Sequence, residues 1–179
     1  MGSVVNAVPA TFAAGCYWGT EKFFCDKFKD AIVSKQVGFM GGSDAPGGVT
    51  YNQVKKGDTG HAEVLHFMYD PTKVSYEELL EFFFRIHDST TLNRQGVDIG
   101  TNYRSAIFYH NDEQKKAAED YIAKLNGLDE KLHSKFQVFG GAKCITTVEK
   151  ASTFYPAHVG HQEYFEKNPN AHCDHRIHY

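Results

Sequence analysis

Cys16 is followed directly by a tyrosine, the only tryptophan of the chain and a glycine, within the stretch AAGCYWGTEKFF (residues 13–24). An apolar run precedes this cysteine and a helical pattern follows it, so Cys16 is predicted at a helix start. The free N–H groups and the dipole there stabilise an anion, which lowers the pKa of a thiol and favours the nucleophilic thiolate. Gly15 and Gly19 leave room beside the sulfur. Taken alone, the pattern fits a nucleophile or a cysteine packed in the core.

Tyr17 and Trp18 bear on whether Cys16 is a nucleophile or a core residue, because they place two large aromatic rings next to the thiol in the sequence. Core packing is the ordinary role of aromatic residues at a helix start. The alternative is an apolar wall beside the thiolate, which suits a small apolar group such as a methyl.

Hydrophobic periodicity predicts the elements that must position these residues. Strands are predicted at 11–15, 33–40, 61–70, 103–110 and 144–150. Helices are predicted at 18–29, 75–87, 111–127 and 158–168. Ser75 with Glu78 has the pattern of a capping box, Asn111 is a cap and Gly127 a stop. We therefore expect an α/β (α+β) fold, a two-layer sandwich with helices packed on a mixed central sheet and a ferredoxin-like core.

The domain organisation predicted from the sequence is one catalytic domain spanning residues 1–179. Residues 1–10 are expected to form an N-terminal extension and residues 168–179 an irregular C-terminal tail. The segments 41–60 and 87–102 are long for connections in a compact domain, which is typical of functional loops.

Composition narrows the class of protein. The formal net charge is −3, with 41% hydrophobic and 23% charged residues, so no nucleic-acid surface and no membrane span is predicted. The N-terminus MGSVVNAVPA lacks the basic and apolar regions of a secretory signal, and Asn6 replaces the Ser or Thr of a myristoylation motif after Gly2. The four cysteines show no CxxC spacing, and a cytoplasmic location is the expectation.

The segment GCYWGTE (15–21) resembles the GCFWG signature of the A-type peptide methionine sulfoxide reductases, the MsrA family. Further blocks resemble that family in the same order, so the resemblance covers the chain from about residue 11 to its tail. These blocks are VTYNQVKKGDTGHAEVLHFMYDP (49–71), FFFRIHDSTTLNRQGVDIGTNYRSAIFY (82–109) and HQEYFEKNPN (161–170).

The resemblance implies that Cys16 is the nucleophile and attacks the sulfur of methionine sulfoxide. The sulfoxide oxygen is a poor leaving group unless it is protonated, and Glu63 in GHAEV matches the family's acid. A carboxyl that donates a proton near neutral pH needs a raised pKa, and an apolar strand face with Leu65 and Phe67 favours one. By residue type alone, Glu63 is more commonly an exposed strand-edge charge.

Five further positions take roles from the same resemblance. Tyr51 and Tyr103 match hydrogen-bond donors to the sulfoxide oxygen, and Asp98 matches a carboxylate that assists through hydrogen bonding. Tyr17 and Trp18 match the aromatic pair that holds the S-methyl group, with Tyr17 replacing the more common Phe. The ordinary alternatives are half-buried aromatics for the two tyrosines and a turn residue for Asp98.

Cys173 lies in the region of the family's recycling cysteine, although Ala171 and His172 replace the usual glycine and tyrosine before it. The resemblance implies that Cys173 condenses with a sulfenic acid on Cys16. Because no cysteine follows Cys173, thioredoxin is expected to reduce the Cys16–Cys173 disulfide directly.

Cys25 and Cys144 match no family role and are expected in the core.

Two residues of the last predicted helix depart from the family pattern, since His158 and Gly160 replace residues that are usually Glu and Tyr. The resemblance therefore predicts the packing of the tail less closely than that of the catalytic core.

Two alternatives remain beside the reductase. A thiol peroxidase would need an arginine against the thiolate, and Arg104 is the residue that could approach Cys16 in space. A non-catalytic metal-binding module is suggested by the tail residues His172, Cys173, Asp174, His175 and His178, although no structural zinc spacing is present.

The function predicted is therefore thioredoxin-dependent reduction of methionine-S-sulfoxide, free and in peptides or proteins. No metal, flavin or nucleotide cofactor is expected, since GGSDAPGG (41–48) lacks the context of a phosphate loop. We expect a monomer whose partners are its sulfoxide substrate and thioredoxin.

Overall fold

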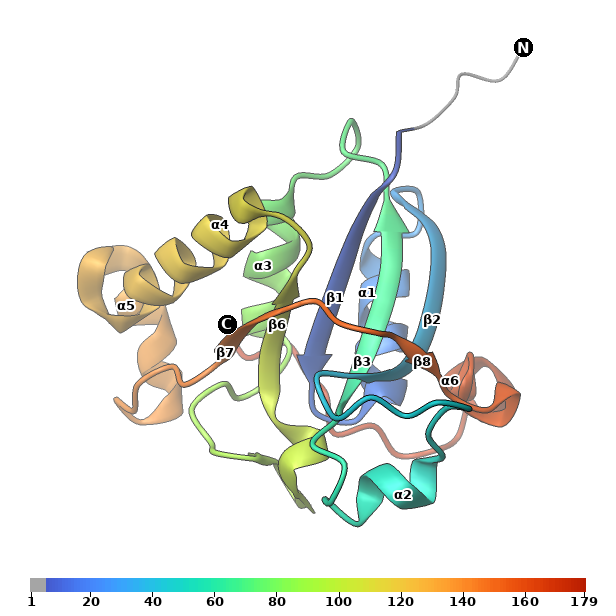
Figure 1. The fold of residues 1–179 in the computed structure, drawn as a ribbon. Coiled ribbons are helices and arrows are strands. Elements are labelled where there is room, and N and C mark those ends of the chain that lie inside the picture. Colours follow the sequence, from blue (N-terminus) through green and yellow to red (C-terminus); the bar gives the residue numbers. More distant parts are fainter. Residues whose placement is uncertain (1–5) are drawn as a thin grey trace.

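The computed structural model describes residues 6–179 and contains a six-stranded sheet with the order β7-β6-β1-β3-β2-β8 (Figure 1). Its strands are β1 (Val8–Ala14), β2 (Ile32–Met40), β3 (Ala62–Tyr69), β6 (Ser105–Tyr109), β7 (Thr147–Lys150) and β8 (Tyr155–Pro156). A separate hairpin consists of β4 (Arg94–Gln95) and β5 (Asp98–Ile99). The helices are α1 (Tyr17–Lys27), α2 (Tyr51–Lys55), α3 (Tyr76–Arg85), α4 (Asp112–Ala123), α5 (Glu130–Phe136) and α6 (Tyr164–Lys167).

The four central strands form a ferredoxin-like core. Along the chain the elements run β1–α1–β2–β3–α3–β6, while in space the strands lie in the order β6-β1-β3-β2 and neighbours are antiparallel. Strands β1 and β2 both pair with β3, so they run in the same direction and need a helical crossover, which α1 provides. Strand β7 pairs with β6 in parallel and makes the sheet mixed. The predicted fold class is confirmed.

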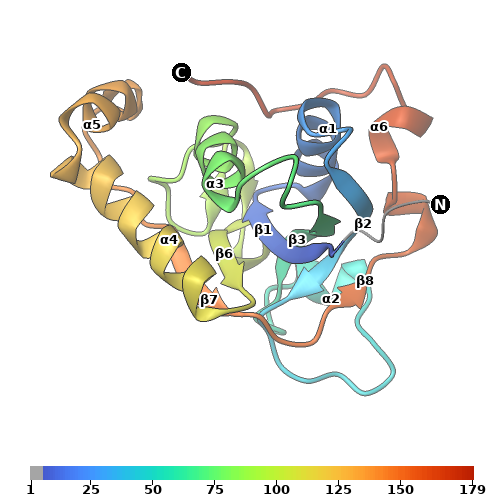
Figure 2. The same ribbon diagram turned by 90° about the horizontal axis from the view of Figure 1, so that it is seen from above.

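The larger part of the core lies between the sheet and helices α1 and α3, which cover one face (Figure 2). The ring of Phe12 in β1 lies 5.5 Å from that of Phe24 in α1 and 5.1 Å from that of Phe83 in α3. The next residue of β1, Ala13, faces a smaller apolar cluster on the opposite side, because strand side chains alternate. The link between β7 and β8 crosses that side, and Phe154 packs there (Figure 1).

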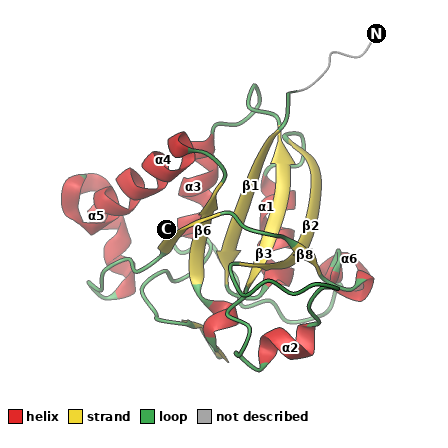
Figure 3. Cartoon of the chain, in the orientation of Figure 1, coloured by secondary structure: helices red, strands yellow, loops and turns green. Residues whose placement is uncertain are grey.

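The predicted caps Ser75 and Asn111 begin helices α3 and α4 (Figure 3). The helix predicted to stop at Gly127 ends earlier, because α4 ends at Ala123 and a π-helical segment, kinked at Gly127, continues to Leu128. The side chains of Ser75 and Asn111 accept hydrogen bonds from the first turns of α3 and α4. Helices α2 and α5 were not predicted. The helix predicted at 158–168 is broken, because Glu163 has a positive φ of 53° between a short 3-10 turn and α6.

The N-terminal extension predicted at 1–10 is shorter than expected, because β1 begins at Val8. The expectations for Gly2 and the first residues of the chain lie outside the described part. Among the helices of residues 6–179, none has the length and apolar character that crossing a membrane requires.

Candidate active site

Cys16 lies where the chain leaves the central strand β1 and enters α1, as the N-cap residue of that helix. The turn into the helix requires a positive φ of 87° at Gly15, a conformation that glycine adopts without strain. The side chain of Gln95 lies against Gly15, where a Cβ atom would approach it to 2.7 Å. The backbone N–H groups of Trp18 and Gly19 point to the sulfur and favour its thiolate.

The thiol of Cys16 nevertheless has a pKa well above its ordinary value, so the expected lowering is wrong for the free protein. Burial is the largest cause, and the charge of Glu63 raises the pKa further. The N–H groups of the helix start act in the expected direction but offset only part of this shift. A protonated thiol is therefore the resting form at neutral pH.

Glu63 reaches the same place from β3 and is only 1% exposed. One carboxyl oxygen accepts a hydrogen bond from the backbone N–H of Tyr17 at 3.3 Å, and the other accepts one from the amide of Asn102 at 3.2 Å. Burial raises the pKa of Glu63 to about 8, and these two hydrogen bonds oppose it. At neutral pH the carboxyl therefore keeps a proton that it can donate. The upward shift of its pKa is the one predicted from its apolar strand face.

Asn102 is a site residue that the sequence reasoning missed. It is buried in the 3-10 turn directly before Tyr103, and a Cβ atom at Gly100 would approach its Oδ1 to 2.6 Å. Its side chain holds the Glu63 carboxyl in place. Its position next to a predicted site tyrosine was the available signal.

One cavity of about 470 Å³ brings most of the predicted residues together. It is lined by Cys16, Trp18, Tyr51, Asp98, Tyr103 and Cys173, among others. Burial raises the pKa of both phenols and of the Asp98 carboxyl. Neutral phenols are hydrogen-bond donors, which is the property required to hold a sulfoxide oxygen.

Two aromatic residues that line the cavity, Trp18 and Tyr51, are held by residues from the far end of the chain. The Trp18 ring stacks on Tyr164 at 3.7 Å between centroids, and its Nε1 donates to Nδ1 of His161 at 3.1 Å. His161 in turn stacks on Tyr51 at 4.9 Å. Sequence reasoning did not assign a role to His161 or Tyr164, since only the fold places them against Trp18.

Tyr17 is fully buried, with its ring against Phe39 and His161. Its hydroxyl has no hydrogen-bond partner among the described residues. Trp18 therefore lines the cavity of Cys16, whereas Tyr17 belongs to the packed layer around it.

The C-terminal tail closes another side of the cavity and carries Cys173 there. The tail is held by His175, whose buried ring donates from Nε2 to the carbonyl of Ala14 at 2.7 Å. The ring lies so close to Gly19 that a Cβ atom there would approach it to 2.1 Å. Gly19 is thus required less for access to the sulfur than for docking of the tail.

The comparison with known proteins agrees with this geometry. Residues 8–179 match the family model described as peptide methionine sulfoxide reductase. This chain belongs to the peptide methionine sulfoxide reductase family. It is accordingly an oxidoreductase that acts on methionine sulfoxide.

Individual members of the family match nearly the whole chain. The MsrA protein of Methanothermobacter thermautotrophicus is 47% identical, with 92% of this chain and 89% of that protein covered. The reduced form of Mxr1 from Saccharomyces cerevisiae is 38% identical with a TM-score of 0.81, covering 96% of this chain and 92% of Mxr1. A structure of the same yeast protein in complex with Trx2 has a TM-score of 0.58 at 28% identity, with coverages of 96% and 89%.

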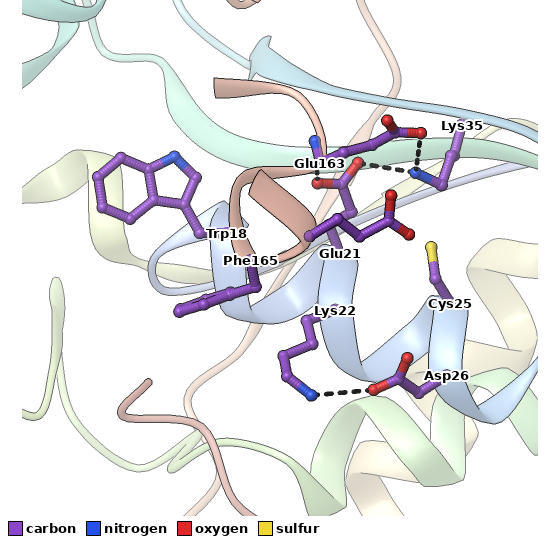
Figure 4. Close-up of a pocket in the computed structure, with 9 residues that line it drawn as sticks. Trp18, Glu21, Lys22, Cys25, Asp26, Lys35, Glu163 and Phe165 are labelled. Atoms are coloured by element: carbon purple, nitrogen blue, oxygen red, sulfur yellow. Dashed lines mark hydrogen bonds and ion pairs between the residues drawn. The ribbon is translucent and has the colours of Figure 1, made fainter. Parts of the chain in front are cut away.

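The segment before the tail is attached beside α1 through Glu163, in the pocket shown in Figure 4. The buried carboxyl of Glu21 pairs with Lys35 at 3.1 Å and accepts the backbone N–H of Glu163 at 2.8 Å. Lys35 also pairs with the side chain of Glu163 at 3.4 Å. These contacts stabilise the left-handed conformation of Glu163 and so place Tyr164 on Trp18.

The same pocket corrects the expectation for Cys25. This thiol is half-buried and lines the pocket, so it is not a core residue. It lies nine positions along α1 from Cys16 and does not line the catalytic cavity. Cys144 is buried, as predicted.

The geometry separates the reductase family from the two alternatives. Arg104 pairs with Glu149 at 3.2 Å and donates to the carbonyl oxygens of Gly60 and Thr101, and no arginine is among the residues that line the cavity of Cys16. The tail histidines do not converge: His172 pairs with Asp174, whereas His175 binds the backbone of β1. Across residues 6–179, no three His, Cys, Asp or Glu side chains are grouped to hold a metal ion.

Proposed function

We propose that this chain reduces methionine-S-sulfoxide, free and in peptides or proteins, by a thiol cycle of Cys16 and Cys173. The observation that carries the proposal is one cavity lined by both thiols and by two neutral phenols, next to a carboxyl whose pKa is about 8. The choice of the S epimer follows from the family and not from a measured distance.

In the first step the sulfur of Cys16 attacks the sulfoxide sulfur. This attack forms a bond between the two sulfurs, and the S–O bond breaks as the oxygen leaves as water with the protons of Glu63 and of the Cys16 thiol. A water molecule then adds to the Cys16 sulfur, the S–S bond breaks, methionine leaves as the thioether, Cys16 carries a sulfenic acid, and the released proton returns to Glu63. The sulfoxide is reduced by two electrons and the Cys16 sulfur is oxidised by two. Glu63 supplies the proton that makes the sulfoxide oxygen a leaving group, while Tyr51 and Tyr103 donate hydrogen bonds to it.

Protonation of Glu63 also serves the nucleophile. The negative charge of Glu63 is one cause of the raised pKa of Cys16, so a neutral carboxyl removes that cause. The N–H groups of Trp18 and Gly19 then favour the developing thiolate without opposition from Glu63. Asp98 is proposed to assist by hydrogen bonding, and Trp18 is proposed to hold the S-methyl group. Tyr17, predicted to share this role, lies in the packed layer around the cavity and does not line it.

In the second step the thiol of Cys173 attacks the sulfenic acid, which releases water and forms the Cys16–Cys173 disulfide. The dithiol of thioredoxin reduces this disulfide and returns both thiols. The yeast relative Mxr1 has been solved with Trx2, which supports thioredoxin as the reductant. We propose that the cycle needs no metal or prosthetic group and runs in a cytoplasmic monomer, where reducing conditions keep thiols free.

Thiol counting after one equivalent of methionine-S-sulfoxide tests the proposal. We expect Cys16 and Cys173 to disappear together while Cys25 and Cys144 remain. Loss of Cys25 or Cys144 in place of Cys173 would reject the assigned recycling thiol. Rapid thioredoxin-linked turnover of hydrogen peroxide with none of the sulfoxide would reject the reductase in favour of a thiol peroxidase.

A further inference from the structure

The hairpin β4–β5 and the turn before it display three large apolar side chains to solvent. Leu92 is 77% exposed, Val97 80% and Ile99 71%. Val97 and Ile99 also line the cavity of Cys16, on the same hairpin that supplies Asp98. We call Val97 and Ile99 the apolar rim.

The apolar rim belongs to a hairpin that is fixed at its base. The side chain of Gln95 accepts a hydrogen bond from the backbone N–H of Asp88 at 2.9 Å and donates one to its carbonyl at 2.7 Å. The backbone N–H of Gly100 donates to the carbonyl of Asn93 at 2.9 Å. A surface held in this way loses little conformational entropy when a ligand covers it.

The position of the rim restricts what can cover it. The reacting groups lie within the protein, since Cys16 is largely enclosed and Glu63 is 1% exposed. The sulfur of methionine is only three bonds from its Cα atom. When the side chain of an oxidised methionine reaches Cys16, the main chain and the neighbouring residues of a polypeptide substrate must therefore cross the mouth of the cavity, where Val97 and Ile99 stand.

We infer that the apolar rim binds apolar residues flanking the oxidised methionine in a polypeptide substrate. The inference rests on the proposed function and names its preferred substrate class: loosened segments of former apolar core. Oxidation converts a buried methionine into a polar group and disrupts its surroundings, so apolar neighbours are exposed together with it. Free methionine sulfoxide has no such neighbours and gains nothing from the rim.

The test compares two substrates in the wild type and in the double variant Val97→Ser, Ile99→Ser. The substrates are a short peptide with methionine-S-sulfoxide between leucines and free methionine-S-sulfoxide, both with thioredoxin as reductant. We expect the ratio of kcat/KM for peptide over free amino acid to fall about tenfold, mainly through KM, as expected for losing part of two apolar contacts. For a peptide with serines in place of the leucines, the same double substitution should change kcat/KM little.

Leu92→Ser is the matched control, because this residue is equally exposed and close by but does not line the cavity. Its substrate ratio should equal that of the wild type. Equal losses for peptide and free amino acid would overturn the inference and make the rim a support of the cavity. A rise in KM for thioredoxin alone would also overturn it and assign the rim to the reductant. Failure of the proposed function itself would be distinct, since the wild type would then reduce neither substrate.

Discussion

The floor and the outer wall of the catalytic cavity are built in different ways. We call Cys16, which lines the cavity, and the buried residues Glu63 and Asn102 beside it the floor. They lie on or beside the central strands, where backbone ladders and a packed apolar core hold the chain. The outer wall comes from residues 161–175, which contact the rest of the molecule through individual side chains such as His175.

This difference matches the two tasks of the site. The acid must stay at a fixed distance from the reacting oxygen, which suits a buried strand. The recycling thiol must travel to the sulfenic acid, which suits a segment with little regular structure and few contacts, because such segments open at low free-energy cost. The experiments below perturb one region at a time, from the largest expected effect to the smallest.

Cys173→Ser should remove the function of the outer wall and leave the floor intact. The variant should produce about one methionine per chain and stop, with a sulfenic acid on Cys16 that a dimedone probe labels. Thioredoxin-driven cycling should be lost. Sustained cycling would show that Cys25 or Cys144 replaces Cys173, and Cys25→Ser serves as the control because it does not line the catalytic cavity.

Glu63→Gln should remove the general acid of the floor and slow the first chemical step. Removal of a positioned general acid costs typically 10²–10⁴-fold in rate, so the first turnover should slow by at least about a hundredfold. Rapid-quench measurement of methionine formation isolates this step from recycling. An unchanged rate would remove Glu63 as the acid.

The pH dependence of the first turnover gives a second test of the floor. The pKa of Glu63 is raised by burial to about 8, so its proton is present below this pH and is lost above it. The acid-dependent rate should therefore fall as the pH rises through about 8. Glu63→Gln should lack this limb, and a limb that persists in the variant would belong to another group.

Gly19→Ala should detach the tail from the floor. Alanine favours a helix over glycine by about 1 kcal/mol, so helix α1 itself gains from the change. The new Cβ atom would approach the ring of His175 to 2.1 Å and displace it. We expect formation of the Cys16–Cys173 disulfide to slow about tenfold relative to sulfenic acid formation, measured by stopped flow. Equal slowing of both steps would indicate damage to the floor instead.

Glu21→Gln should loosen the wall by a smaller amount. Glutamine keeps an acceptor for the N–H of Glu163 but loses the charge that pairs with Lys35. The stack of Tyr164 on Trp18 should weaken, with KM for the sulfoxide rising a few-fold and kcat little changed. Asp26→Asn is the matched control, because its pair with Lys22 on the same helix is exposed and contributes little. Equal changes in both variants would contradict a role for Glu21 in holding Glu163 and so Tyr164.

Much of the fold was predictable because it rests on local chemistry. The caps Ser75 and Asn111 act within one helical turn. The second half of β3 shows the predicted alternation, since Leu65, Phe67 and Tyr69 are buried and the residues between them are less so. Helix α2 escaped prediction because it has only five residues, stabilised by the reciprocal cap of Thr50 and Gln53. The prediction of one helix at 158–168 was wrong because of a tertiary contact. The backbone N–H of Glu163 donates to the Glu21 carboxyl, which stabilises Glu163 in a left-handed conformation inside this segment.

The sequence by itself determined the chemical groups of this protein: a thiol at a strand-to-helix turn, a strand carboxyl, phenols, an aromatic pair and a tail thiol. It also determined the family, through residues that match in order. Only the tertiary structure decided their protonation, because a pKa depends on burial and on charges from distant segments. The helix start that was expected to lower the pKa of Cys16 is a local effect, and burial together with Glu63 outweighs it. The tertiary structure also assigned roles to four residues through contacts between distant segments of the chain. These residues are Asn102, His161, Glu21 and His175.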